Sequence, residues 1–172
     1  MRIFLIGSMG CGKSTMGRSL ASLLNLTFID LDTYLEGKYF KTIPQIFSEE
    51  GEEEFRRKER KALGEVATFS NVIVATGGGA PCFFDNMDVM NQAGYCIFLD
   101  VDTDSLVSRL LHSKTERPLI KGKSPDELKS FIQLLMQKRR PFYEKAHYVL
   151  TGAEIHPQQI VDLVENERLQ DK

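Results

Sequence analysis

The sequence predicts an α/β protein built as a three-layer sandwich, with helices covering both faces of a five-stranded parallel sheet. Short apolar runs typical of buried strands alternate with segments whose apolar residues recur at helical spacing. This alternation favours a parallel sheet, because the helix that connects two parallel strands packs against the sheet. Polar or glycine-rich segments follow the first three expected strands, at the edge where such sheets bind ligands.

The expected strands and helices are spread over the whole chain. The strands are expected at residues 2–6, 27–29, 71–75, 95–99 and 147–150. The helices are expected at about 13–24, 32–40, 43–49, 52–68, 84–91, 103–111, 124–138, 139–145 and 157–168. Pro141 marks either the start of the helix at 139–145 or a kink.

Length and composition favour a single domain, residues 1–172, with a sizeable core. The chain has 42% hydrophobic and 27% charged residues, which is typical of a soluble globular protein. Its formal net charge of −2 disfavours nucleic acid as a partner, and no apolar run is long enough to span a membrane. The three cysteines lack metal-ligand spacing and suit free thiols in a reducing cytosol. We therefore expect a cytoplasmic protein, and because no exposed apolar stripe indicates an obligate dimer, we expect a monomer.

Residues 7–14 read GSMGCGKS and match the phosphate-binding pattern G-x-x-x-x-G-K-[ST], known as the P-loop or Walker A motif. An apolar run before them and a helical pattern after them place this loop between a strand and a helix. Backbone N–H groups and the helix N-terminus then converge on one point, which favours a bound phosphate. Lys13 is expected to reach the β- and γ-phosphates of a nucleoside triphosphate, and the Ser14 hydroxyl to bind Mg²⁺.

Two carboxylates follow the second expected strand. Asp30 and Asp32 alternate in residues 28–32, and period-two spacing places both on the same side of an extended chain. One is suited to Mg²⁺, usually through water, and the other to a substrate hydroxyl. The alternative is that Asp32 caps the next helix while Asp30 is solvated.

Three further segments carry arginine or glycine in a notable pattern. Arg56 and Glu59 lie at i,i+3 in a charged helix and can pair, although charged runs on helices are mostly solvated faces. Three glycines at residues 77–79 indicate that a group approaches the backbone closely. Arg139 and Arg140 follow a long helical pattern. They can face a ligand, or either can interact with the last carbonyls of that helix.

The polar segment at about residues 112–124 does not fit the alternation of strands and helices. It reads HSKTERPLIKGKS, with four basic residues besides Pro118 and Gly122, so we expect a loop. A basic loop in a phosphate-binding protein suggests a mobile lid that closes over ATP. The alternative is an ordinary solvated loop.

Taken in order, these motifs resemble the shikimate kinase family over about residues 1–165. The resemblance implies a P-loop kinase fold like that of nucleoside-monophosphate kinases, with a five-stranded parallel sheet, a mobile lid and a substrate-binding region at about residues 32–60. The six motifs together are much more specific than any one alone. They are the phosphate-binding loop with Lys13-Ser14-Thr15, Asp30-x-Asp32, Phe55-Arg56-x-x-Glu59, Gly77-Gly78-Gly79-Ala80, Arg117-Pro118-Leu119 and Arg139-x-Pro141-x-Tyr143.

The resemblance also implies a reaction, in which ATP and shikimate give ADP and shikimate 3-phosphate in chorismate and aromatic amino-acid biosynthesis. The implied cofactor is Mg²⁺, held by Ser14 and, through water, by Asp30. The implied catalytic residues are Lys13, Asp32 and Arg117. The implied ATP-binding residues are Gly10, Cys11, Gly12, Lys13, Ser14, Thr15, Arg109, Arg117 and Pro157. The implied shikimate-binding residues are Asp32, Arg56, Gly77, Gly78, Gly79 and Arg139, with Glu59 orienting Arg56.

Two other functions compete with the one that the resemblance implies. The first is another kinase of the same fold, acting on gluconate or a nucleotide. A nucleotide acceptor would need a base-binding site, and a neutral polyol would not need Arg56 and Arg139, which suit a carboxylate. The second is a regulatory nucleotide-binding module, which would usually lack Lys13, Ser14 or the aspartate pair, all of which are present.

Overall fold

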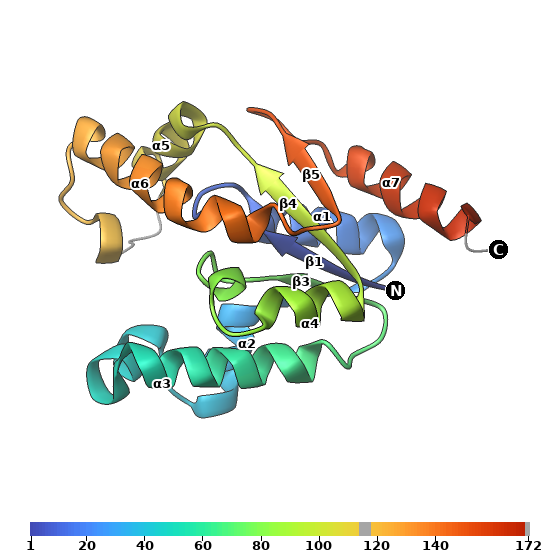
Figure 1. The fold of residues 1–172 in the computed structure, drawn as a ribbon, viewed down its shortest axis with the longest axis horizontal. Helices are drawn as coiled ribbons and strands as arrows, with labels where there is room; N and C mark the ends of the chain where they lie inside the picture. Colours follow the sequence, from blue (N-terminus) through green and yellow to red (C-terminus); the bar gives the residue numbers. More distant parts are fainter. Residues whose placement is uncertain (114–117, 171–172) are drawn as a thin grey trace.

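The computed structural model describes residues 1–113 and 118–170, and within them five strands form one sheet in the order β2-β3-β1-β4-β5. All four neighbouring pairs are parallel, as Figure 1 shows. This confirms the predicted α/β fold class. The strands are β1 (Arg2–Ile6), β2 (Thr27–Asp30), β3 (Val72–Ala75), β4 (Tyr95–Asp100) and β5 (Tyr148–Thr151).

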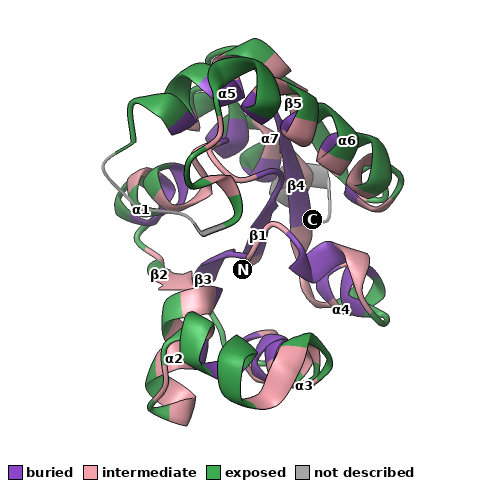
Figure 2. Cartoon of the chain, turned by 90° about the vertical axis from the view of Figure 1, so that its left-hand side faces the viewer, coloured by how far each residue is buried: buried purple, intermediate pink, exposed green. Residues whose placement is uncertain are grey.

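Helices cover both faces of the sheet. The helices α1 and α7 pack against each other on one face, and α4 and α6 lie on the opposite face (Figures 1 and 2). The pair α2 and α3 extends beyond the β2 edge of the sheet. The α-helices are α1 (Lys13–Leu24), α2 (Leu31–Tyr39), α3 (Ile43–Val66), α4 (Asn86–Ala93), α5 (Thr103–Leu111), α6 (Pro125–Tyr143) and α7 (Pro157–Gln170). Two short 3-10 helices are η1 (Ala80–Cys82) and η2 (Pro118–Ile120).

The three central strands lie in the middle of the core. Every residue of β3 is buried, as are all but the first residue of β1 and of β4, so Figure 2 shows these strands mainly in purple. A strand covered on both faces reads as a continuous apolar run rather than as an alternating pattern. The edge strands β2 and β5 are only partly buried, which is why their patterns are less continuous.

Two helices are longer and more continuous than the expected segments, while the others differ by at most two residues at their ends. The helices expected at 43–49 and 52–68 form one element, α3, but Gly51 inside it has the non-helical angles φ 83° and ψ 171°, so the expected break is present. The break expected between residues 138 and 139 is wrong, because α6 continues through Pro141 to Tyr143. Near a helix C-terminus, proline removes only one of the last hydrogen bonds. The fully buried Tyr143 ring, packed against Phe98, holds the final turn in place.

The helix after the phosphate-binding loop packs very closely on β2. A Cβ on Gly17 of α1 would lie 2.3 Å from Cε2 of Phe28, a distance that no real side chain tolerates. Glycine at this position therefore sets the contact between α1 and the strand that ends at Asp30. Within residues 1–113 and 118–170, no helix is both long and apolar enough to cross a membrane.

Candidate active site

The phosphate-binding loop, residues 7–14, connects β1 to α1 and depends on glycine for its shape. Gly7, Gly10 and Gly12 have φ values of 142°, 80° and 95°, where other residues are strained. A Cβ on Gly7 would also lie 2.8 Å from the carbonyl oxygen of Leu99. Gly12 precedes the first turn of α1 and provides no side-chain cap, so no side chain of the N-cap occupies the N–H groups that begin the helix. These groups are oriented as a phosphate site requires.

Lys13 lies over the phosphate-binding loop. Its Nζ donates hydrogen bonds of 2.8 Å to the carbonyl oxygens of both Gly7 and Ser8. The ammonium group is thereby held inside the curve of the loop, where the β- and γ-phosphates of ATP would lie. Cys11 is 5% exposed, and its Sγ lies 3.7 Å from Lys13 Nζ, while Thr15 is exposed in the first turn of α1.

Asp30 joins the phosphate-binding loop to the next helix. Its Oδ2 accepts a hydrogen bond of 2.7 Å from the Ser14 hydroxyl, and its Oδ1 accepts from the backbone N–H groups of Asp32 and Thr33. Asp30 is therefore the N-cap of α2, and the alternative in which Asp32 caps that helix is wrong. The helix begins at Leu31, so Asp32 lies in its first turn and not on an extended strand as the spacing predicted.

Asp32 remains close enough to Asp30 for the two charges to interact. Burial raises the pKa of Asp32, and the charge of Asp30 raises it further. Lys13 and Arg56 oppose this shift by stabilising the ionised carboxylate. The Asp32 carboxylate thus interacts electrostatically with the cation of the phosphate-binding loop and with a cation from α3.

The glycine segment, residues 77–79, follows β3 and faces four charged side chains. One of them, Asp32, comes from α2, two come from α3 (Arg56 and Glu59), and one, Arg139, comes from α6. Because glycine has no side chain, these groups can approach the backbone directly. A Cβ on Gly77 would lie 2.9 Å from Asp32 Oδ1 and 3.1 Å from Glu59 Oε1, one on Gly78 would lie 3.1 Å from Arg139 Nη1, and one on Gly79 would lie 2.7 Å from Arg56 Nη2.

Arg56 and Glu59 form the predicted i,i+3 pair, with 2.8 Å between Arg56 Nη1 and Glu59 Oε2. The Glu59 side chain is 1% exposed, and burial raises its pKa to about 7 although Arg56 acts in the opposite direction. The Arg56 guanidinium stacks 4.1 Å from the centre of the Phe83 ring. Its buried Nε has no hydrogen-bond partner within the described residues. The charged run does have a solvated face, but that face carries Arg57, which is 61% exposed, and not Arg56.

Helix α6 places its two consecutive arginines differently. Arg139 lies beside Gly78, and the hydroxyl of Tyr143 donates a hydrogen bond to the Gly78 carbonyl oxygen. The alternative of Arg139 interacting with terminal helix carbonyls is wrong, because the helix continues beyond it. Arg140 instead pairs with Asp100 at the end of β4. Asp100 is not among the residues expected from the sequence, although it lies at a strand end, which is the same signal that identifies Asp30.

Arg109 links the phosphate-binding loop to the segment after β5. Its Nη1 donates to the carbonyl oxygen of Cys11 at 3.2 Å, and its Nη2 donates to that of Ala153. The segment at residues 152–156 leads to Pro157, the first residue of α7. Arg109 thus contacts the phosphate-binding loop directly, and the segment at residues 152–156 is joined to the loop through Arg109. Arg117 lies outside the described residues, and of the segment expected as a lid the structure describes 112–113 and 118–124.

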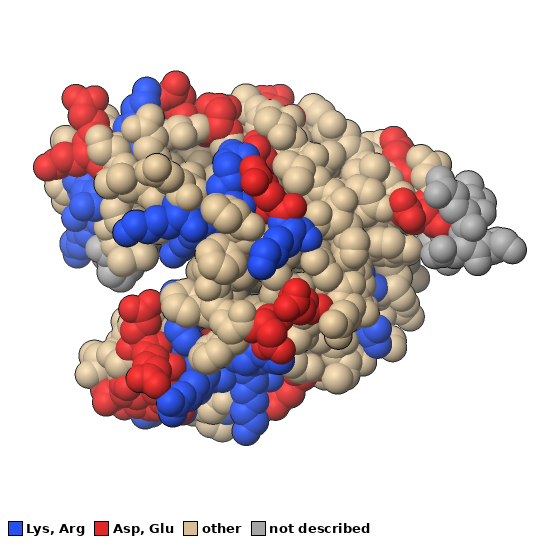
Figure 3. Space-filling view, viewed as in Figure 1, with Lys and Arg blue, Asp and Glu red and all other residues tan. Residues whose placement is uncertain are grey.

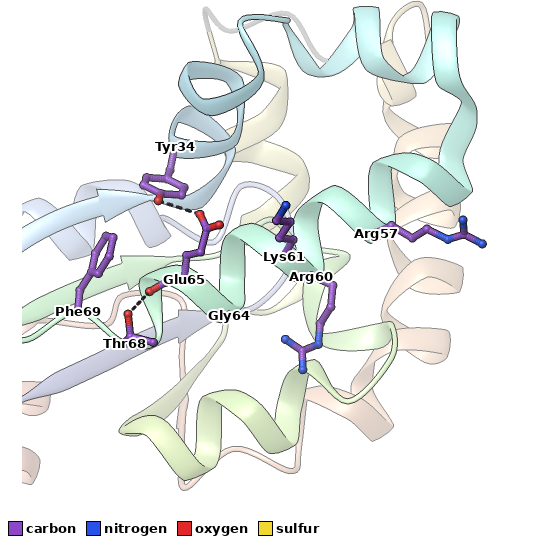
Figure 4. Close-up of a pocket in the computed structure, with 8 residues that line it drawn as sticks. All are labelled: Tyr34, Arg57, Arg60, Lys61, Gly64, Glu65, Thr68 and Phe69. Carbon is purple, nitrogen blue, oxygen red and sulfur yellow. Dashed lines mark hydrogen bonds between the residues drawn. The ribbon is translucent and has the colours of Figure 1, made fainter.

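A space-filling view shows a notch between the part of the molecule that carries α6 and the part that carries α3, with basic side chains on both sides (Figure 3). A pocket of about 560 Å³ lies elsewhere, on the outer surface of α3 (Figure 4). Its Arg60 is paired with Asp85, and its Glu65 with Lys38. None of the predicted site residues lines it. Its lining consists of Tyr34, Arg57, Arg60, Lys61, Gly64, Glu65, Thr68 and Phe69.

The donor set suits Mg²⁺ rather than a metal held by protein alone. Within residues 1–113 and 118–170, no cluster of three His, Cys, Asp or Glu side chains could hold a metal ion. Mg²⁺ does not require one, because it keeps several waters and also binds substrate phosphates. The hydroxyl of Ser14, with the Asp30 carboxylate 2.7 Å behind it, offers one direct ligand and one acceptor for metal-bound water.

A phosphate-binding loop at a helix N-terminus, facing a carboxylate and two arginines at the same edge of a parallel sheet, defines an ATP-dependent P-loop kinase of small molecules. The comparison with family models is more specific, since the model for shikimate kinase matches residues 9–167. The chain belongs to the shikimate kinase family.

Individual relatives agree with this assignment. The shikimate kinase of Parabacteroides distasonis is 50% identical over 161 residues, which cover 90% of this chain and 93% of the relative. The solved shikimate kinase of Bacteroides thetaiotaomicron has a TM-score of 0.92 and 46% identity, with 96% of this chain and 98% of that chain covered. A gluconokinase from Sinorhizobium meliloti has a TM-score of 0.63 at 17% identity, with 99% of this chain and 97% of that chain covered, and shares the fold alone.

Proposed function

We propose that this chain transfers the γ-phosphoryl group of ATP to the 3-hydroxyl of shikimate, giving shikimate 3-phosphate and ADP in chorismate biosynthesis. The observation that carries the proposal is the buried, unpartnered Nε of Arg56, at the glycine segment that Arg139 also meets. Buried donors are almost always satisfied, so an acceptor is expected here, and two guanidinium groups suit a carboxylate. The shikimate kinase of Acinetobacter baumannii, solved in complex with shikimate, supports it with a TM-score of 0.84 at 34% identity, covering 99% of this chain and 94% of that chain.

On the acceptor side, Arg56 and Arg139 bind the shikimate carboxylate, and Glu59 orients Arg56 from behind. Asp32 holds the reacting hydroxyl and can accept its proton, while the backbone of Gly77, Gly78 and Gly79 lies against the ring. A raised pKa in Asp32 strengthens its hold on a proton. Phosphoryl transfer passes through a loose transition state, so holding the hydroxyl in line contributes more than removing its proton.

On the donor side, Lys13 and Arg117 stabilise the charge of the transferring phosphoryl group. The loop backbone at Gly10, Cys11, Gly12 and Thr15 surrounds the phosphates, and Arg109 and Pro157 lie on the adenine side. Ser14 and Asp30 would hold Mg²⁺, which when bound neutralises phosphate charge.

The wider architecture of the proposal is a single cytoplasmic domain that acts as a monomer. Within it, the segment at about residues 112–124 closes as a lid over ATP, and the region at about residues 32–60 forms the shikimate side. Closure would exclude water, which prevents ATP hydrolysis.

The test is an assay coupled to ADP release, in which shikimate, quinate, gluconate and AMP are compared as acceptors. We expect efficient turnover with shikimate and little with AMP or gluconate. The variant Lys13→Ala is the background control. It should lose turnover while still binding shikimate, so any activity left in its preparation comes from contaminating kinases. A higher kcat/KM with gluconate or AMP than with shikimate would overturn the proposal.

A further inference from the structure

Asp100 and Arg140 form a two-point ion pair between β4 and α6. Arg140 Nη2 lies 2.7 Å from Asp100 Oδ1, and Arg140 Nη1 lies 3.1 Å from Asp100 Oδ2. The Asp100 side chain is 10% exposed and that of Arg140 is 42% exposed. Because the planar guanidinium meets both carboxylate oxygens, the pair fixes a direction as well as a distance. It therefore fixes the rotation of α6 at the turn that also carries Arg139.

A second contact attaches the same turn of α6 to the same strand. The ring of Tyr143 packs against Phe98 with 5.0 Å between centroids, and its hydroxyl donates to the carbonyl oxygen of Gly78. The Arg140 guanidinium also lies 5.7 Å from the centre of the Phe98 ring. The end of α6 is thus held on β4 while Arg139 faces the glycine segment.

Asp100 continues the connection toward the nucleotide side. Its carbonyl oxygen accepts a hydrogen bond of 3.2 Å from the backbone N–H of Gly152. The next residue, Ala153, accepts from Arg109, which also donates to the carbonyl oxygen of Cys11 in the phosphate-binding loop. A continuous set of contacts therefore runs from Arg139, through the Asp100–Arg140 pair, to the phosphate-binding loop.

We propose, resting on the proposed function, that the Asp100–Arg140 pair is a positioning element that couples shikimate binding to nucleotide binding. A carboxylate bound to Arg139 fixes this turn of α6, and Arg140 passes the constraint to Asp100 and the 152–153 backbone. A nucleotide that fixes Arg109 acts on the same contacts from the other end. Coupling between two ligands is reciprocal, so each strengthens the binding of the other by the same factor.

The competing role is fold stability alone. Losing a pair that only stabilises the fold would lower the free energy of unfolding but leave the mutual effect of the two ligands unchanged. The ratio of the shikimate Kd without ADP to the Kd with saturating ADP separates the two roles. ADP is chosen because the complex with shikimate cannot turn over.

The experiment measures that ratio by calorimetry in the full-length protein. We expect a ratio above 1 in the wild type and a decrease of about 2- to 30-fold toward 1 in Arg140→Met, the range found when residues along a coupling network are changed. Arg140→Lys keeps the charge but not the two-point geometry, and should give an intermediate ratio. Glu144→Gln removes the other, exposed partner of Arg140, at 3.3 Å, and should behave as wild type.

A double variant guards against loss of folding. Asp100→Asn with Arg140→Gln leaves no buried charge unpaired, and it should remain folded while showing the reduced ratio. The proposal is overturned if folded Arg140→Met or the double variant keeps the wild-type ratio, or if ADP leaves the wild-type shikimate Kd unchanged. Failure of the wild type to bind shikimate would contradict the proposed function itself, and the coupling with it.

Discussion

The carboxylate of Asp32 and the backbone of Gly77 lie so close that a Cβ on Gly77 would be 2.9 Å from Asp32 Oδ1. The same Cβ would lie 3.1 Å from Glu59 Oε1. One missing side chain thus allows a helix N-terminus and the middle of another helix to place carboxylates against the same peptide. The proposed acceptor side of the site depends on this missing side chain.

Replacing Gly77 with alanine should therefore displace Asp32 or Glu59. Overpacking of this kind costs about 1–3 kcal/mol, and we expect the KM for shikimate to rise while the KM for ATP changes little. Gly37→Ala is the matched control, because a Cβ placed on Gly37 would have no neighbouring atom within 4 Å. It lies in α2, where alanine should stabilise by up to about 1 kcal/mol. Unchanged shikimate kinetics in Gly77→Ala would contradict the geometry.

Replacing Arg139 with leucine should weaken shikimate binding far more than ATP binding. Removing one partner of a desolvated charge pair typically costs about 2–5 kcal/mol. Separate titrations with shikimate and with ADP would measure the two effects. Arg57→Leu serves as the control, since Arg57 is 61% exposed and its partner Glu53 is 81% exposed. Equal weakening of both ligands in Arg139→Leu argues against its place in the shikimate site.

The buried Glu59 predicts a pH dependence of stability. Its pKa in the folded protein is about 7, above the ordinary value of 4.5, because burial outweighs the pairing with Arg56. Between these values the folded state binds more protons than the unfolded state, so the free energy of unfolding falls as pH rises from about 4.5 to about 7. The contribution is at most about 3 kcal/mol.

Glu59→Gln isolates this effect, because glutamine has nearly the same shape and does not titrate. Urea unfolding across pH 4–8 should give a curve that falls less steeply for the variant than for the wild type. Parallel curves would mean that the pKa of Glu59 is the same in the folded and unfolded states, and they would contradict the raised pKa.

Ser14 and Asp30 share a hydrogen bond of 2.7 Å, but only Asp30 also caps a helix. Ser14→Ala should raise the Mg²⁺ concentration needed for half-maximal activity and leave stability almost unchanged. Asp30→Ala should do the same and also cost about 0.5–2 kcal/mol, because Asp30 is the N-cap of α2. Activity titrated with Mg²⁺, together with urea unfolding, separates the two. Normal Mg²⁺ dependence in both variants would exclude them as a metal site.

The fold could be predicted because its signals are local. The apolar runs of β1, β3 and β4 are continuous since both faces of each strand are covered, and glycine and lysine spacing identifies the phosphate-binding loop. What could not be predicted depends on how distant elements meet. The sequence does not show that Arg56 faces inward while Arg57 faces solvent, or that Arg140 meets Asp100, 40 residues away. Nor does it show that packing of Tyr143 would carry α6 past Pro141.

The contact between Gly17 and Phe28 determines when the groups of the donor site become aligned. Because no side chain separates α1 from β2, the helix cannot slide along the strand, and Ser14 on one is held in register with Asp30 on the other. The cost of aligning these groups is met once, when the chain folds, and not again in each turnover. The donor half of the site is therefore rigid before substrate binds, and any adjustment to substrate occurs in the side chains and segments that face it.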